Sequence, residues 1–140
     1  MYFSDAFQMN GGYAICAGLE QVIDYICNLK FEDDDIQYLN SLNKFSDKFL
    51  DYLKTFKFTG DIWAIPEGTV IFPNEPLLTV RAPIIEAQII ETMVLLLLNH
   101  QSLIATKSTI IVSAAKGRPV MEFGARRAQG YDSATYGARA

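Results

Sequence analysis

The stretch P-V-M-E-F-G-A-R-R-A, Pro119–Ala128, joins a short apolar run to two adjacent arginines, Arg126 and Arg127. The run predicts a buried strand that ends at Gly124 in a positively charged loop. In α/β proteins the loops after the C-terminal ends of strands bind ligands. Two guanidinium groups there suit a carboxylate or a phosphate, because each offers a planar fork of donors and keeps its charge. The residues alone leave a second interpretation open, in which both arginines lie on the surface and pair with acids.

The charge of the chain is distributed unevenly around this stretch. Residues 1–115 hold 7 basic and 14 acidic side chains, whereas residues 116–140 hold 5 basic and 2 acidic ones. An anion site is therefore expected at the arginine-rich end. The net charge of −4 argues against a general nucleic-acid-binding protein, which needs a broad basic surface.

Three helices are predicted in the first half of the chain. The first starts at Gly18, and its apolar residues fall on one stripe at helical spacing. That stripe consists of Leu19, Val22, Ile23 and Ile26. The acidic cluster Glu32–Asp35 predicts the first turn of a second helix rather than a metal site, because four successive acids cannot all face one ion. Ser46 is expected to cap a third helix.

A β-rich segment follows these helices. Three short strands are predicted at Asp61–Pro66, Thr69–Phe72 and Leu77–Ala82, joined by tight turns into a small antiparallel sheet. Nothing in the segment points to catalysis. Glu67 is interpreted as a turn residue rather than as a general acid.

The pattern from Glu86 to about Lys116 is helical and predicts one long helix, or two with a break near Asn99-His100. Polar residues are scattered through it, so it is expected to meet a second domain or a second subunit. His100, the only histidine, is interpreted as a structural residue. A last helix is expected near the end of the chain, capped by Asp132 or Ser133, with its N-terminus adding donors to the anion site.

Several absences limit the functional class. Cys16 and Cys27 form neither a metal pattern nor a disulfide framework, and they are interpreted as buried thiols of a reducing cytoplasm. There is no signal-peptide pattern, and the longest unbroken apolar run, Met93–Leu98, is too short to span a bilayer. A soluble cytoplasmic protein with no membrane partner and no metal site is therefore expected.

Four stretches in register resemble the nicotinate phosphoribosyltransferase family. They are G-G-Y-A-I-C-A-G-L-E (Gly11–Glu20), F-T-G-D-I-W-A-I-P-E-G-T-V (Phe58–Val70), N-H-Q-S-L-I-A-T-K (Asn99–Lys107) and E-F-G-A-R-R-A-Q-G (Glu122–Gly130). Together they span nearly the whole chain.

The resemblance implies an α+β fold that leads into α/β. Residues 1–118 would form a helical N-terminal domain with a small antiparallel sheet, and residues 119–140 would be the first strand and helix of a phosphoribosyltransferase-type barrel. The implied activity joins nicotinate to phosphoribosyl pyrophosphate, giving nicotinate mononucleotide and pyrophosphate for NAD synthesis. ATP hydrolysis, with Mg²⁺, and a homodimer are implied for the full enzyme.

The resemblance also implies roles for three residues. Phe123 would take the face of the pyridine ring, and Arg126 and Arg127 would hold carboxylate or phosphate oxygens, with Arg126 expected to matter first. No catalytic residue is expected in this chain, because the segment that carries the family's phosphorylated histidine has no counterpart here. The isolated chain is therefore expected to be inactive. The alternative is a non-catalytic, shortened relative that serves dimerisation or ligand sensing.

Overall fold

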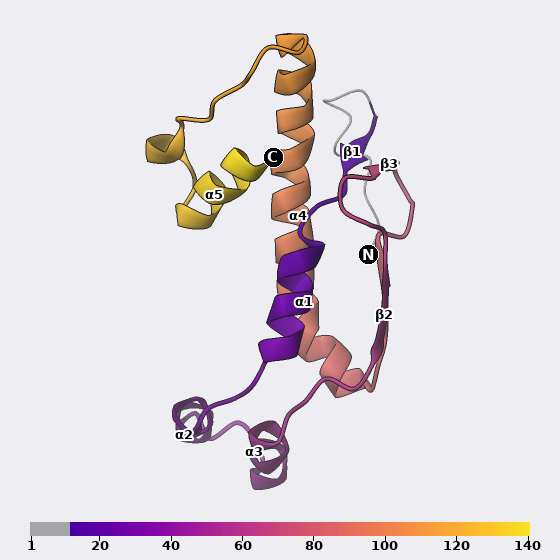
Figure 1. Cartoon of the computed structure of the whole chain (residues 1–140). Helices are drawn as coiled ribbons and strands as arrows, with labels where there is room; N and C mark the ends of the chain where they lie inside the picture. The colour runs from indigo at the N-terminus through magenta and orange to yellow at the C-terminus, as the bar shows by residue number, and fades with distance from the viewer. Residues whose placement is uncertain (1–11) are drawn as a thin grey trace.

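A single long helix organises the structure, a computed structural model that describes residues 12–140 (Figure 1). This helix, α4, runs over Ile84–Ala115 and is 32 residues long. Figure 1 shows α1 along it, the strands on one side, α2 and α3 beyond its N-terminal end, and α5 beside its C-terminal half. The other elements are β1 (Ala14–Ile15), α1 (Leu19–Asn28), α2 (Asp33–Ser41), α3 (Asp47–Lys54), β2 (Asp61–Ala64), β3 (Val70–Ile71), β4 (Leu78–Arg81), the 3₁₀ helix η2 (Ala125–Arg127) and α5 (Tyr131–Arg139).

The main core forms where α1 and β4 pack on α4. Its buried members are Val22, Leu78, Ile90, Val94 and Leu98. The predicted stripe of α1 is confirmed at Val22 but is wrong at Ile23, which is 54% exposed. Both positions suit a helix face by spacing, and only the direction from which α4 approaches decides which one is buried.

The predicted start of the second helix at Glu32–Asp35 and the predicted cap of the third at Ser46 are both confirmed. Glu32 caps α2 and forms a reciprocal capping box with Asp35. Ser46 caps α3, and its hydroxyl accepts the backbone N–H of Phe49 at 3.4 Å. These contacts involve residues three apart, so the local sequence is sufficient to specify them.

The predicted three-stranded sheet is wrong in its pairing. The strands form two separate antiparallel ladders, with β2 beside β4 and β3 beside β1. The second ladder joins Ala14 to Ile71 and Ile15 to Val70. β3 therefore pairs with β1, a strand that precedes the first helix, whereas the turn pattern had predicted pairing with the neighbouring strands of the β-rich segment.

Helix α4 continues without interruption through Asn99-His100, so the first of the two predicted alternatives, one long helix, is confirmed. Its buried polar residues contact strand β1 and the turn after it: the Thr106 hydroxyl accepts the N–H of Ile15 at 2.9 Å, and the Ser102 hydroxyl accepts the N–H of Ala17 at 3.1 Å. By length and composition alone α4 would qualify as a membrane span, with a mean hydropathy of 1.4 over its most apolar window. The contacts of Ser102 and Thr106 are instead those of a helix packed inside a folded domain.

The strand predicted at Pro119–Phe123 is not formed. These residues carry no regular structure, and Met121 and Phe123 are 77% and 79% exposed. A barrel strand needs neighbouring strands to satisfy its backbone groups, and within residues 12–140 none lies beside this segment. The last helix is present as α5, but its N-cap is Gly130 rather than Asp132 or Ser133.

The two cysteines differ in their surroundings. Cys16 is buried as predicted, and burial, reinforced by the negative charge of Glu67, raises the pKa of its thiol. Cys27 is exposed on α1, so the prediction of a second buried thiol is wrong.

Candidate functional site

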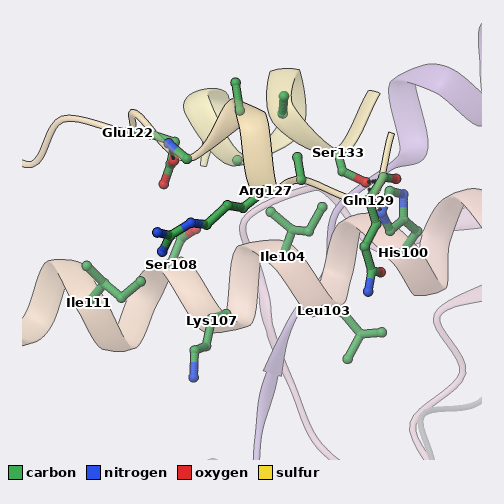
Figure 2. A pocket seen from close by; sticks show the side chains of 15 residues that line it. His100, Leu103, Ile104, Lys107, Ser108, Ile111, Glu122, Arg127, Gln129 and Ser133 are labelled. Atoms are coloured by element: carbon green, nitrogen blue, oxygen red, sulfur yellow. Dashed lines mark hydrogen bonds between the residues drawn. The ribbon is translucent and has the colours of Figure 1, made fainter. Parts of the chain in front are cut away.

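A cavity of about 400 Å³ lies between α4 and the segment that carries the arginines (Figure 2). Helix α4 forms one wall, with His100, Lys107 and Ser108 among its polar residues. Residues of η2 and α5, including Arg127 and Ser133, form the opposite wall. The cavity thus places two cationic side chains, two serine hydroxyl groups and the carboxylate of Glu122 around an otherwise largely apolar space.

The positions of the predicted site residues are unequal. Arg127 lines the cavity, and Figure 2 shows its side chain lying over α4 toward Ser108 and Ile111. Arg126 and Phe123 are exposed and do not line it. The structure therefore brings one of the three predicted residues to the cavity and leaves two at the surface.

The turn that presents the arginines is held by local hydrogen bonds. The backbone N–H of Arg127 donates to the carbonyl of Gly124 at 2.7 Å, which closes the 3₁₀ turn. The Glu122 carboxylate accepts the backbone N–H of Gly124. Within the part of the chain that the structure describes, neither Arg126 nor Arg127 forms an ion pair, so both guanidinium groups keep their donors for another anion.

His100 connects α4 to α5 at the edge of the cavity. Its Nε2 lies 2.9 Å from the Ser133 hydroxyl, and its ring packs edge-to-face on Tyr136 with the centroids 5.8 Å apart. The Ser133 hydroxyl donates its single proton to the carbonyl of Gln129 at 2.8 Å. The imidazole N–H is therefore the donor to Ser133, the reverse of the polarity in which a histidine activates a serine nucleophile. The geometry fits the structural role predicted for His100.

Glu67 takes part in contacts that the sequence analysis missed. One carboxylate oxygen accepts the N–H groups of Gly18 at 2.6 Å and Leu19 at 2.7 Å, and the other accepts from Arg139 at 2.6 Å. Burial acts to raise the pKa of this carboxyl. The hydrogen bonds from Arg139 and from the start of α1, with the positive charge of Arg139, outweigh burial and leave the pKa lowered. The interpretation as a turn residue gave its place in the chain but not these partners.

The described residues do not supply a metal site. Among residues 12–140 no three histidines, cysteines or acids come together in a way that suits an ion. The cavity lining supplies a single carboxylate, that of Glu122, beside the cations Lys107 and Arg127, which is a poor donor set for Mg²⁺.

Comparisons with known proteins point to one family. The family model described as nicotinate phosphoribosyltransferase (NAPRTase) N-terminal domain matches residues 3–99. Nicotinate phosphoribosyltransferase pncB2 of Mycobacterium tuberculosis H37Rv is 52% identical over 127 residues, which cover 91% of this chain and 27% of that protein. The nicotinate phosphoribosyltransferase of Bacillus subtilis is 45% identical over 129 residues, 92% of this chain and 26% of that protein.

A solved structure shows the same arrangement of elements. The crystal structure of human nicotinic acid phosphoribosyltransferase superposes with a TM-score of 0.80 at 32% sequence identity, covering 91% of this chain and 27% of the human one. The chain thus spans about a quarter of the length of the relatives that it matches.

Proposed function

Because the chain belongs to the nicotinate phosphoribosyltransferase family, we propose that it is the part of such an enzyme that presents the arginine pair to a substrate. The enzyme as a whole would join nicotinate to phosphoribosyl pyrophosphate, giving nicotinate mononucleotide and pyrophosphate for NAD synthesis. The observation that carries the proposal is the guanidinium group of Arg127, which lines a cavity and has no acidic partner among residues 12–140.

The chemistry of the reaction explains why arginines are needed. Nicotinate carries a carboxylate, the second substrate carries phosphates, and negative charge builds on the departing pyrophosphate in the transition state. Cationic donors fixed in advance stabilise that charge strongly, because they do not have to reorganise during the reaction. Arg127 would hold one of these anionic groups, with Arg126 beside it. Phe123, now 79% exposed, would supply an apolar face for the pyridine ring.

The exposed segment around Phe123 is proposed to be the point where a second domain begins. We place the boundary between Arg118 and Pro119, so that residues 1–118 form the N-terminal domain and residues 119–140 begin an α/β barrel. The support is the exposure of three apolar side chains in this segment, which is 48% for Val120, 77% for Met121 and 79% for Phe123. Further strands beside Pro119–Phe123 would cover these residues.

The remaining parts of the proposal rest on the family alone. They are a homodimer, a cytoplasmic location, and coupling to ATP hydrolysis with Mg²⁺ held by residues outside the described part of the chain. ATP and Mg²⁺ would assist the overall reaction by driving it toward product. Arg126 and Arg127 would only bind and orient anionic groups of the substrates.

The test is alanine substitution of each arginine in the full-length protein that contains this chain. Arg127→Ala is expected to lower kcat/KM for nicotinate mononucleotide formation by about thirty-fold to several-thousand-fold, equivalent to roughly 2–5 kcal/mol for a lost charge-assisted contact. The structure shifts the first expectation from Arg126 to Arg127, since only Arg127 lines the cavity. Arg127→Lys should also be impaired, because an ammonium group cannot reproduce the bidentate fork.

Arg118→Ala is the matched control, since Arg118 is also exposed and lies outside the cavity. Its kinetics should remain within about two-fold of the unmodified protein, as expected for a surface substitution of no more than about 0.5 kcal/mol. Unchanged kinetics in both alanine variants, Arg126→Ala and Arg127→Ala, would remove the arginine pair from substrate binding.

A further inference from the structure

The carboxylate of Glu67 joins three segments that are distant in the sequence. It lies in the turn between β2 and β3, and its side chain is only 22% exposed. One oxygen receives both N–H groups at the start of α1, from Gly18 and Leu19. The other receives the guanidinium of Arg139, 72 residues away at the end of α5. The hydrogen bonds of the Glu67 carboxylate are thus divided: one oxygen binds the start of α1, and the other binds the end of α5.

Residues 122–130, which carry Arg126 and Arg127 and are called the arginine segment below, have no buried hydrophobic residue to hold them in place. None of the residues from 116 to 140 is buried. The 3₁₀ helix η2 contacts α5, and α5 in turn lies against α4. The position of Arg127 over the cavity therefore depends on where α5 is held.

Helix α5 is held at both ends by polar contacts. Near its N-terminus Ser133 bonds to His100, and at its C-terminus Arg139 bonds to Glu67. Glu20 adds a second, longer ion pair to Arg139 at 3.3 Å, but its side chain is 73% exposed and contributes little. The Glu67 contact is the shorter and more buried of the two acid contacts.

We propose that Glu67 is a positioning residue for the arginine segment. It ties the C-terminal end of α5 to the start of α1, and through α5 it sets the place of Arg127 above α4. The attachment of α5 through Glu67 does not depend on the function proposed for the arginines. The consequence for kinetics rests on the proposed function of the arginine pair.

The chemistry of the contact requires a carboxylate. A glutamine at position 67 would keep one oxygen, which could still accept the N–H groups of Gly18 and Leu19. Its other terminal atom would be an NH₂ group, which would face the guanidinium of Arg139 donor to donor. Glu67→Gln therefore separates the cap of α1 from the anchor of α5.

The experiment measures hydrogen exchange and kinetics together in the full-length protein. In Glu67→Gln we expect amides of α5 and of residues 122–130 to exchange at least about ten-fold faster, while those of α1 change little. kcat/KM for nicotinate mononucleotide formation should fall about ten-fold. Arg139→Gln should give the same two changes, Arg139→Lys should restore part of both, and the double variant should be no worse than either glutamine variant.

Glu75→Gln is the matched control, because Glu75 also accepts a backbone N–H, that of Phe72 at 2.9 Å, and has no arginine partner among residues 12–140. It should leave α5 and the kinetics unchanged. Unchanged exchange of α5 in both Glu67→Gln and Arg139→Gln would overturn the proposal. If Glu67→Gln does not fold, Arg139→Gln decides alone, since it alters only an exposed side chain.

The two proposals fail in different ways. Faster exchange of α5 with normal kinetics, in a protein where Arg127→Ala is impaired, would overturn the link from Glu67 to the arginine segment and leave the arginine site standing. Faster exchange in a protein where Arg126→Ala and Arg127→Ala are both normal would support the anchor and overturn the proposed function.

Discussion

Helices α1 and α5 are alike in length and in the way they begin, but they are attached to α4 by different forces. Each follows a glycine with a strongly positive φ, 102° at Gly18 and 98° at Gly130. Helix α1 buries Val22 completely against α4, whereas no residue of α5 is buried. Apolar burial and close backbone approach therefore fix α1, while a few polar contacts, each worth about 1 kcal/mol, hold α5.

The largest effect should come from the core beneath α1. Leu98→Ala is expected to destabilise the chain by about 3–5 kcal/mol, because Leu98 is 2% exposed and its loss leaves a cavity against Val22. Leu96→Ala is the control on the same helix, since Leu96 is 55% exposed and should cost less than about 1 kcal/mol. Urea denaturation measures both. Similar losses at the two positions would mean that α1 is not held by burial.

The two helix-capping glycines offer the most direct comparison. A Cβ at Gly18 would come within 2.7 Å of the carbonyl oxygen of Leu97, whereas one at Gly130 would meet no atom of the described residues within 4 Å. Gly18→Ala should therefore cost about 2–4 kcal/mol from backbone strain and steric overlap together. Gly130→Ala should cost only the strain, about 1–2 kcal/mol. Equal losses in thermal or urea unfolding would show that α1 does not approach α4 as closely as described.

A smaller effect is expected where α4 contacts strand β1. Thr106→Val removes the hydroxyl that accepts the N–H of Ile15, leaving a poorly hydrated donor at a cost of about 1–3 kcal/mol. Thr109→Val, one turn further along, removes only a bond to the carbonyl of Ala105 and should be nearly neutral. Urea denaturation of the two variants distinguishes a bond between elements from one within a helix. Neutral behaviour of Thr106→Val would contradict the assigned contact.

The smallest effect concerns the attachment of α5 and its dependence on pH. The pKa of Glu67 is lower in the folded protein than its ordinary value of 4.5. The ion pair with Arg139 is therefore fully present above that value and is lost as the pH falls through the folded pKa. Exchange protection of α5, corrected for intrinsic rates, should decline below about pH 4.5. The decline should be weaker in Glu67→Gln; an identical profile would show that Glu67 is not responsible for it.

The sequence predicted what depends on neighbouring residues. The caps at Glu32 and Ser46 and the long helix were all predictable, because a helix turn joins residues three or four apart. Contacts between residues that lie far apart in the sequence were not predictable from such local patterns. The pairing of β1 with β3 spans more than fifty residues, and Glu67 finds its partners 48 to 72 residues away.

The site was predictable to a similar extent. The arginine pair led to the prediction of an anion site by residue type, but the cavity that Arg127 lines forms only when α5 folds back on α4. Nothing in the local pattern around Arg127 indicates that His100 and Glu67 hold the helix that follows it. The prediction of a strand at Pro119–Phe123 was wrong for a related reason. A strand needs a neighbouring strand, and no partner for this segment lies within residues 12–140.

The length of α4 has a consequence for how this protein family can change over evolutionary time. The helix meets α1 around Ile90–Leu98, β1 at Ser102 and Thr106, and α5 at His100, all from one continuous rod of about 48 Å. One residue inserted between Leu98 and His100 would rotate everything after it by about 100° and shift it by about 1.5 Å. The face that receives β1 would then point elsewhere. Insertions and deletions should accordingly be excluded from this stretch, or occur in steps of about seven or eleven residues, which restore the phase of the helix.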